Sequence, residues 1–348
     1  MQRLDKKIQL ILAGLIFTLL IFVAAQPRNV TSPTSPQPIT SPPTTTLFFG
    51  GDIMLSRNVA GRMISHNDYT WPFKNVAEQI SKTDIAFANL ESPFNDEGRY
   101  FVEGTLVFNA DPRAVAGLKL AGLDILSTAN NHAFDQGQKG IDFTIETLQQ
   151  NGIIPAGTIH SNQTEILPTI KHNGYIYGFL AYSYTALNDG GKTIDPHVKN
   201  FNDLGGLKQD IIDMKGHTAD IVIVSMHAGS EYKRTPDQNQ IDFAHAAIDA
   251  GADMVIGHHP HWIQTVEQYK GKWIFYSLGN FVFDQMWSQD TREGLTVFVN
   301  YQENEIKKIE LKPVIIEDYC CPRWANSEES SAILLKINLT NPVLIDKN

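Results

Sequence analysis

Cysteine is nearly absent from this sequence of 348 residues, and the two that occur are neighbours, Cys320 and Cys321. Adjacent cysteines cannot join distant parts of a fold, and they lack the ligand spacing of a zinc finger. A disulfide-stapled scaffold and a zinc finger are therefore excluded. We predict two ordinary thiols near the end of the folded domain.

Basic residues are also scarce, with 28 Lys and Arg against 38 Asp and Glu and a formal net charge of -10. We expect no nucleic-acid partner, because the chain has no basic stripe that would neutralise phosphates. The same balance gives no support to binding of a polyanion through overall charge.

A long apolar run occurs only once, from Ile8 to Ala25, after the basic residues Arg3, Lys6 and Lys7. The run is just long enough to span a bilayer, and the preceding positive charges favour a cytoplasmic N-terminus. Small residues at its end also resemble a signal-cleavage site. We predict a membrane anchor or signal segment over residues 1–26. The rest of the chain would then be extracytoplasmic, on the cell membrane or secreted after cleavage.

Pro, Thr and Ser make up fifteen of the 20 residues from 27 to 46, which predicts an extended linker.

From residue 47 apolar strand-like runs alternate with helical patterns over 111–122, 140–150 and 241–250, typical of an α/β fold. Asn173-Gly174 predicts a hairpin turn. We assign one domain to 47–317 and a C-terminal tail, partly loose, to 318–348, with 332–337 as a helical turn or edge strand.

Five apolar runs of the predicted domain end in residues that bind metals. In open α/β sheets ligands bind just beyond the carboxyl ends of strands, so these side chains are expected in one crevice. The mixture of carboxylate, amide and imidazole suits a pair of divalent ions. The run ends carry Asp52; Asn89 and Glu91; Asn130, Asn131 and His132; His227; and His258, His259 and His261.

Each motif also has a simpler interpretation as a turn residue, a helix cap or a buried polar side chain. The histidine cluster is the hardest to explain in that way, because burying unpaired imidazoles is costly. In an extended segment His259 and His261 would point to one side as ligands, and His258 to the other, where it would contact substrate or orient a partner. His132 could be a ligand or a general acid, with Asp135 three residues on to orient its ring. Near a further strand end, Asn280 or Asp284 would support the site from outside the ligand set.

Six ordered motifs, GDIML, ANLESPF, ANNHAFDQG, HAGSEY, GHHPHWIQ and YSLGNFVFDQ, resemble the signature set of the CapA family of bacterial poly-γ-glutamate capsule-synthesis proteins. The resemblance covers almost the whole chain after the linker. It implies a metallophosphoesterase-like, or calcineurin-like, fold: a β-sandwich flanked by helices.

The resemblance also implies site roles. Divalent metal, one or two ions of Mn, Fe or Zn, would be held by Asp52, Glu91, Asn131, His227, His259 and His261. His132, oriented by Asp135, would protonate the leaving group. Two residues after Asp52 the superfamily usually has His, where this chain has Met54, and Glu91 replaces a bridging Asp. These departures argue against ordinary phosphatase activity.

Three functions remain open at the level of sequence. The first is an anchored enzyme of capsule or wall polymer metabolism, cleaving phosphoester or γ-glutamyl amide bonds in an anionic polymer or cell-wall substrate. The second is a non-catalytic member of a membrane complex for polymer synthesis or export, with a structural metal and other membrane components as partners. The third is a generic phosphoesterase.

Overall fold

A computed structural model describes residues 42–347, apart from 103, 163–164, 166 and 185–195. The predicted membrane anchor over 1–26 and most of the predicted linker lie outside the described residues. Within the described part, no helix has the length and apolar character needed to cross a membrane. The first strand begins at Thr45, so the last two residues of the predicted linker belong to the folded domain.

Two sheets form the centre of the domain. Among the described residues the first sheet has nine strands. Its main path is β14 (Cys321–Trp324), β13 (Glu305–Glu317), β12 (Glu293–Gln302), β1 (Thr45–Ile53), β2 (Ile85–Leu90), β3 (Ile125–Ser127) and β4 (Ile154–Ala156), with β11 (Asn280–Val282) on β1 and β15 (Val343–Asp346) on β13. The second sheet has six strands. Their order is β5 (Thr169–His172), β6 (Tyr175–Ser183), β7 (Ile221–His227), β8 (Met254–His258), β10 (Lys272–Phe275) and β9 (Val266–Tyr269).

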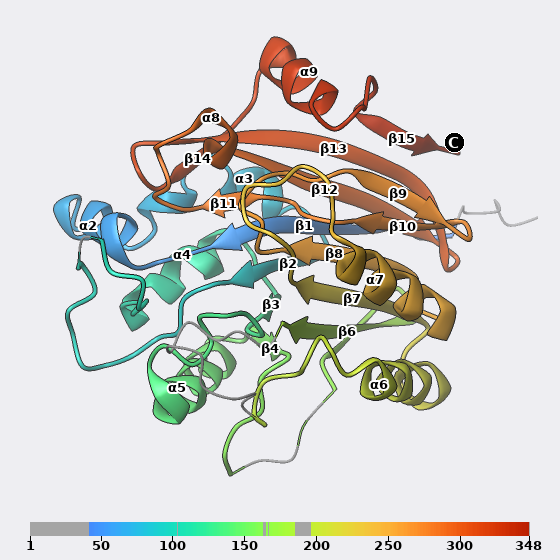
Figure 1. The fold of residues 1–348 in the computed structure, drawn as a ribbon, viewed down its shortest axis with the longest axis horizontal. Coiled ribbons are helices and arrows are strands. Elements are labelled where there is room, and N and C mark those ends of the chain that lie inside the picture. Colours follow the sequence, from blue (N-terminus) through green and yellow to red (C-terminus); the bar gives the residue numbers. More distant parts are fainter. Residues whose placement is uncertain (1–41, 103, 163–164, 166, 185–195, 348) are drawn as a thin grey trace, which may run out of the picture. The chain divides into compact units, whose positions relative to one another are not determined.

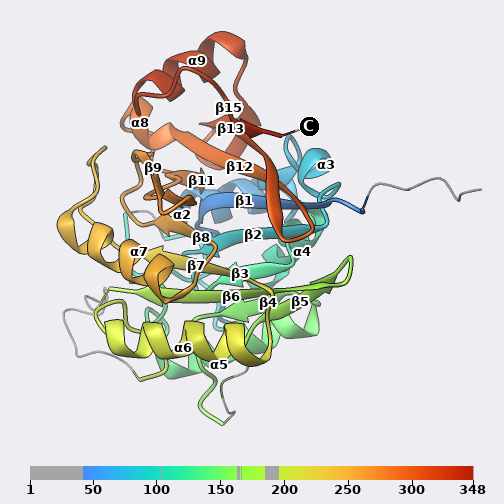
Figure 2. The same cartoon turned by 90° about the vertical axis from the view of Figure 1, so that its right-hand side faces the viewer.

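Most helices connect parallel strands, and several of them cover the outer faces of the sheets. The α-helices are α2 (Arg57–Ser65), α3 (Ala77–Ile80), α4 (Val115–Leu120), α5 (Gly137–Gln150), α6 (Leu204–His217), α7 (Gln238–Ala250), α8 (Gln289–Arg292) and α9 (Ser327–Leu335). The part of the chain that the structure describes also has two short 3-10 helices, η1 (Trp71–Phe73) and η2 (Pro112–Ala114). Figure 1 shows their arrangement around the sheets, and Figure 2 shows α6 lying along the outer side of the sheet that contains β6.

Alternation along the central strands builds three layers of core. In β1, Phe49 faces the space between the sheets, whereas Phe48 packs under the helices on the outer side. In β7, Ile223 faces inward and Val224 packs toward α6 and α7. Successive side chains of a strand point to opposite faces, so strands that are apolar throughout are buried on both sides. The predicted α/β sandwich with flanking helices is therefore confirmed.

The carboxyl ends of the parallel strands meet at one edge of the domain. β1, β2 and β3 are mutually parallel in one sheet, and β6, β7 and β8 in the other. The arrowheads of β1, β2, β7 and β8 point the same way (Figure 1). Polar residues that follow these strands are thus delivered to a common place, as the sequence pattern predicted.

Local predictions had mixed outcomes. The hairpin at Asn173-Gly174 is confirmed, with φ of 48° and 87° at the two turn residues between β5 and β6. The helix expected over 111–122 is divided into η2 and α4, with Asp111 as the N-terminal cap of η2. The prediction of two ordinary thiols was wrong, because Cys320 and Cys321 are joined in a disulfide between adjacent residues.

The segment expected as a partly loose tail contributes to the folded domain. Residues 318–347 supply β14, α9 and β15, and both strands pair with β13. Ile333, Leu334 and Ile337 lie in the core between the sheets. Asn326 caps α9 by accepting from the backbone N–H groups of Glu328 and Glu329. The polar run that suggested looseness is therefore a helix start, where Asn and Glu are favoured.

Candidate metal centre

Asp52 stands near the end of β1 in a locally irregular stretch of strand. The pairing of β1 with β2 shifts register between Phe49 and Asp52, and Asp52 then lies opposite Asn89. Such bulges re-aim side chains beside functional sites. The preceding Gly51 allows β1 to approach β11, since a Cβ there would lie 2.0 Å from the carbonyl oxygen of Gly279. Asp52 itself is fully buried.

Glu91 follows β2 and is the most exceptional side chain of the site. It is completely buried, and neither carboxylate oxygen has a hydrogen-bond partner. Burial, and then the negative charge of Asp52, raise the pKa of Glu91 well above its usual range. A buried carboxylate without a partner is costly unless a cation or a proton neutralises it.

Two groups of ligand atoms meet at Glu91. Asp52, Glu91 and His261 form one group, and Glu91, His227 and His259 form the other; within each group the ligand atoms lie within 4.8 Å of one another. Glu91 belongs to both groups, as a bridging carboxylate would. Carboxylate and imidazole ligands suit Mn, Fe and Zn ions, and the two unpartnered oxygens of Glu91 fit such a site.

His259 and His261 lie in a turn and not in the extended segment that we predicted. The prediction assumed an extended segment, but β8 ends at His258 and the chain then turns. His259 and His261 have φ of 97° and 58°, in the left-handed region that is unusual for residues with a side chain. Strain of this kind is concentrated at functional sites. The premise was therefore wrong, although both rings lie in the ligand groups.

The three imidazoles of the ligand groups are kept neutral by their surroundings. Burial, and then the neighbouring His261, lower the pKa of His259 to about 3. Burial, and then the nearby His259, lower the pKa of His227 well below its ordinary value. The pKa of His261 is lowered as well, chiefly by burial. Neutral imidazole is the form that binds a metal, so these rings need no deprotonation at neutral pH.

Asn89 and Asn130 connect the strand ends beneath the ligands. Asn89 donates to Asp52 over 2.8 Å, and its side-chain nitrogen lies 3.3 Å from Nδ1 of His227. Asn130 donates to the oxygen of Asn89 over 3.2 Å and to the Leu90 carbonyl over 2.8 Å. Asn89 therefore contacts two members of the ligand groups, and Asn130 holds Asn89 and the backbone next to Glu91.

Other predicted residues lie at the edges of the ligand set. Oδ1 of Asn131 is 2.8 Å from Nε2 of His227, next to the second group. Oδ1 of Asn280 is 2.9 Å from Nδ1 of His261. His258 is completely buried beside the first group, with Nδ1 3.3 Å from Asp52. Burial alone would raise the pKa of Asp52, but the His258 and His261 rings hold it below the ordinary value.

His132 and Asp135 form a buried pair close to Glu91. Nδ1 of His132 lies 2.7 Å from Asp135, and Nε2 lies 3.9 Å from Glu91. With Nδ1–H donated to Asp135, Nε2 is the nitrogen directed at the ligand groups. This geometry leaves His132 outside both groups and suits a proton donor oriented by a carboxylate.

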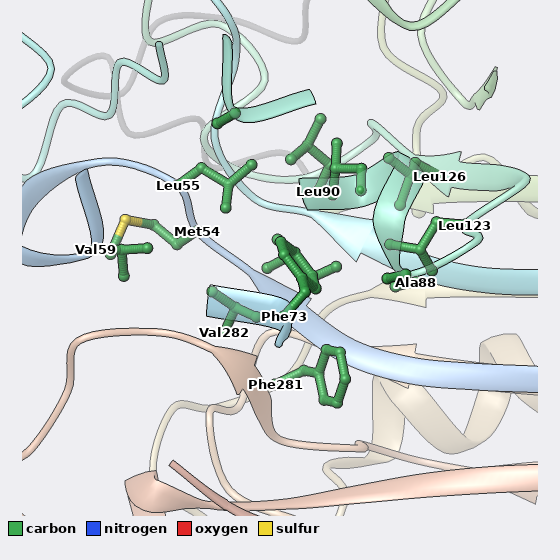
Figure 3. Close-up of a cluster of buried hydrophobic side chains, with 14 of the residues drawn as sticks. Met54, Leu55, Val59, Phe73, Ala88, Leu90, Leu123, Leu126, Phe281 and Val282 are labelled. Carbon is green, nitrogen blue, oxygen red and sulfur yellow. The ribbon is translucent and has the colours of Figure 1, made fainter. Parts of the chain in front are cut away.

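Met54 stands where the wider superfamily usually has a ligand histidine, and its side chain takes no part in the site. It is fully buried in the apolar cluster beneath the helices. Figure 3 shows its thioether beside Val59 and Leu55. Met54 also accepts a hydrogen bond at sulfur from the Ser56 backbone N–H. In this chain the position belongs to the hydrophobic core.

Several residues around the site gave no signal in the sequence. Phe108 stacks on His132, and Arg57 lies over Phe108 and pairs with Asp284, which is thus engaged away from the ligand groups. Tyr184 and Tyr232 pack against His259 and His261. Burial, and then the charge of Glu231, raise the pKa of Tyr184 to about 12. Lone aromatic residues in irregular segments carry no periodic pattern, so only the structure reveals them.

Two facing sheets that bring acidic and imidazole side chains together at the carboxyl ends of their parallel strands give a metallophosphoesterase-like fold. In agreement, the fold resembles the solved structure of a novel phosphatase from Mycoplasma pneumoniae, with a TM-score of 0.53, 14% identity and coverage of 85% of this chain and 99% of that one. The family model described as Bacterial capsule synthesis protein PGA_cap matches residues 46–285, and the chain belongs to this family.

Two relatives support the assignment. The chain is 31% identical over 288 residues to the capsule biosynthesis protein CapA of Bacillus anthracis, covering 78% of this chain and 68% of that protein. It is 33% identical over 284 residues to the PGA biosynthesis protein CapA of Bacillus subtilis, covering 78% and 71%. The resemblance found in the six motifs is therefore confirmed.

Proposed function

We propose that this chain is a metal-dependent hydrolase of capsule or cell-wall polymer synthesis that cleaves phosphoester or γ-glutamyl amide bonds. The observation that carries the proposal is the state of Glu91. Its two oxygens are buried without partners, it is common to two ligand groups, and His132 lies 3.9 Å away. A buried carboxylate without hydrogen-bond partners is stabilised by bound cations, and the neighbouring His132 could serve as a proton donor.

The residues divide the chemistry between them. One or two ions of Mn, Fe or Zn would be held by the ligand groups together with Asn131, and would supply a water molecule of lowered pKa. Asp135 holds Nδ1–H of His132 and so fixes the ring orientation. The protonated ring would then donate from Nε2 to the departing oxygen or nitrogen. The buried surroundings of Glu91 and His227 exclude bulk water and strengthen these electrostatic interactions.

The polymer and the membrane enter the proposal from two sources. The Bacillus relatives are named for capsule and PGA biosynthesis, which supports an anionic polymer or cell-wall substrate. The basic and apolar pattern over residues 1–26 supports anchoring to the cell membrane, with an extracytoplasmic domain and other membrane components as partners. A C-terminal reporter that functions only after export should be active in cells. Activity of a reporter restricted to the cytoplasm would refute this topology.

A non-catalytic role in a polymer synthesis or export complex is the second candidate, and Met54 favours it. The superfamily's usual histidine is replaced by a core side chain, so the first ligand group has one protein ligand fewer. A metal held there could serve folding alone. A generic phosphoesterase is the third candidate, and the same departure counts against it.

Metal analysis of the purified full-length chain, combined with a turnover screen, separates these candidates. We expect bound transition metal, and metal-dependent cleavage in a panel of phosphoesters and γ-glutamyl peptides. Bound metal without turnover of any member would favour the structural role. Efficient cleavage of many unrelated phosphomonoesters would favour the generic enzyme, and absence of metal would refute the proposal.

A further inference from the structure

Phe108 holds the His132–Asp135 pair from two directions. Its ring stacks on the imidazole, with centroids 3.7 Å apart and an interplanar angle of 16°. Its backbone N–H donates to Oδ2 of Asp135 over 2.5 Å, and this is the oxygen that His132 contacts. One residue therefore fixes both the plane of the ring and the carboxylate that orients it.

Phe108 is in turn contacted by the partly buried cation of Arg57. Cζ of Arg57 lies 4.8 Å from the Phe108 ring centroid, and Nη1 donates to the Thr105 carbonyl over 3.3 Å. Arg57 also pairs with Asp284, which accepts from the backbone and side chain of Asn58 over 3.2 and 3.1 Å. The edge of Phe283 completes the enclosure, with ring centroids 6.2 Å apart.

The backbone at Arg57 supports a functional reason for this assembly. Arg57 has φ of 49°, in the left-handed region, directly at the start of α2. Its backbone N–H donates to the carbonyl of Tyr100, which ties the helix start to the segment that carries Phe108. An unfavourable backbone conformation that is held by several contacts is typical of residues that set site geometry.

We propose that Phe108, braced by Arg57, is a positioning residue that keeps Nε2 of His132 aimed at the leaving group. The inference rests on the proposed hydrolase function, in which His132 is the proton donor. Proton transfer depends on sub-ångström placement, and displacement of about 1 Å can cost about 100-fold in rate. Phe108 is only 2% exposed, so its ring acts through His132 and does not need to touch substrate.

The same trio of imidazole, aromatic ring and carboxylate occurs elsewhere in the domain and provides a matched control. His245 stacks on Tyr269 with centroids 3.7 Å apart and an interplanar angle of 6°, and its Nε2 lies 2.9 Å from Glu267. Neither ligand group contains any of these residues. The variant Y269L therefore removes an equivalent stack without touching the metal centre.

Leaving-group dependence tests the proposal through turnover. A misplaced proton donor matters most for a poor leaving group, so F108L should slow cleavage of an alkyl phosphate at least about tenfold more than cleavage of p-nitrophenyl phosphate. The loss should fall on kcat with KM little changed. F108Y, which keeps the ring, should restore the wild-type ratio, and Y269L should leave it unaltered. An equal loss on both esters in F108L would overturn the proposal.

A second readout does not depend on turnover. In the full-length chain, loaded with Zn²⁺ and labelled with ¹⁵N-histidine, the His132 signal is identified by its absence from H132A. In the neutral form of the ring, wild type, F108Y and Y269L should show a single tautomer with the proton on Nδ1, and F108L a mixture. An unchanged tautomer in F108L would refute the role of Phe108. If F108L does not fold, F108M, which keeps an apolar side chain of similar length, is judged by the same two outcomes.

The two readouts separate failure of this inference from failure of the proposed function. If the wild-type chain cleaves neither ester and no γ-glutamyl peptide of the panel, the enzymatic proposal loses its support, yet the tautomer comparison still decides whether Phe108 positions His132. If the wild type cleaves both esters, and F108L has the same ratio of cleavage rates and the same tautomer, the hydrolase proposal is kept and the positioning role of Phe108 is refuted.

Discussion

The two sheets supply chemically different halves of the candidate metal centre. The nine-stranded sheet provides carboxylates at the ends of β1 and β2, and the six-stranded sheet provides imidazoles at and after the ends of β7 and β8. In the oxygen half, the pKa of Glu91 is raised by burial and by the charge of Asp52. In the imidazole half, the pKa values of His227 and His259 are lowered by burial.

The difference shows how the site is prepared for a cation. The oxygen half carries a buried carboxylate that is unstable as an anion without a positive charge beside it. The imidazole half already holds its rings in the neutral form that binds metals. A cation bound between the halves would neutralise the buried negative charge of the oxygen half and would leave the imidazoles in their neutral form. Each half should therefore respond differently to mutation and to pH.

Removing the shared carboxylate should have the largest effect. E91Q keeps the side-chain shape but loses the charge common to both ligand groups, so we expect metal affinity to fall more than about 100-fold, beyond the loss typical of residues that only support ligands. Elemental analysis after dialysis measures it. E293Q is the matched control, because Glu293 is also buried but pairs with Lys336 over 2.6 Å. Full metal content in E91Q would disprove the bridging role.

The imidazole half can be dissected one ion at a time. H259A should lose the ion of the second group and H261A that of the first, while the double variant should retain no transition metal and stay folded. Metal stoichiometry and circular dichroism measure both properties. H245A, at a surface pair with Glu267, is the control. Unchanged metal in the double variant would contradict the assignment of these two ligands.

His132 lies near Glu91 but outside both ligand groups, so it should matter for rate without mattering for metal. The general-acid role predicts that H132A loses about 10² to 10⁴ in turnover while it keeps its fold and metal content. Kinetics and elemental analysis on the same sample check this. Loss of metal would make His132 a ligand. Full biological activity in H132A, with activity lost in ligand variants, would favour the structural role.

In the metal-free protein the halves should respond to pH in opposite directions. Glu91 has a raised folded-state pKa, so its contribution to stability is complete below about pH 4.5 and is lost as pH rises through the raised value. His259 has a pKa lowered to about 3, so its contribution is complete above about pH 6.5 and is lost as pH falls toward 3.

Thermal melting of chelator-treated protein across pH tests these signs. E91Q should remove the destabilisation on the alkaline side, and H259A should reduce the one on the acidic side, each relative to wild type. Because other groups also titrate, the test compares the pH dependence of the melting temperature between each variant and wild type. Identical pH profiles for E91Q and wild type would show that Glu91 is not the source.

The oxygen half could be predicted from sequence more directly than the imidazole half. Asp52 lies near the end of β1 and Glu91 follows β2, so the apolar strand runs and the rule for sheet edges placed them together. His259 and His261 themselves have positive φ in the turn after β8, which no periodicity indicates. Their inclusion in the ligand groups was expected, but the extended geometry was wrong because the turn depends on tertiary contacts, such as the bond from the Tyr232 N–H to the Pro260 carbonyl.

Other parts of the molecule depended on contacts that sequence does not encode locally. Phe108 meets His132 across 24 positions of chain, within an irregular segment without helical or strand pattern. The end of the domain was underestimated because a polar helix start resembles a loose tail, although the same Asn and Glu form a capping box. Long-range packing and capping geometry decided both cases.

Met54 gives the smallest expected effect and tests whether the oxygen half lacks a ligand. M54L replaces one buried apolar side chain by another of similar volume, so the free energy of unfolding should fall by less than about 1.5 kcal/mol. Metal content and turnover should equal wild type, because the thioether packs with Val59 and Leu55 in the apolar cluster. Chemical denaturation and elemental analysis measure the two quantities. If M54L lost metal, the sulfur would have to serve as a ligand, and the oxygen half would no longer depend on carboxylate and amide oxygens alone. If metal is retained, the first group functions with Asp52, Glu91 and His261 as its protein ligands, and the missing superfamily histidine is not replaced at this position.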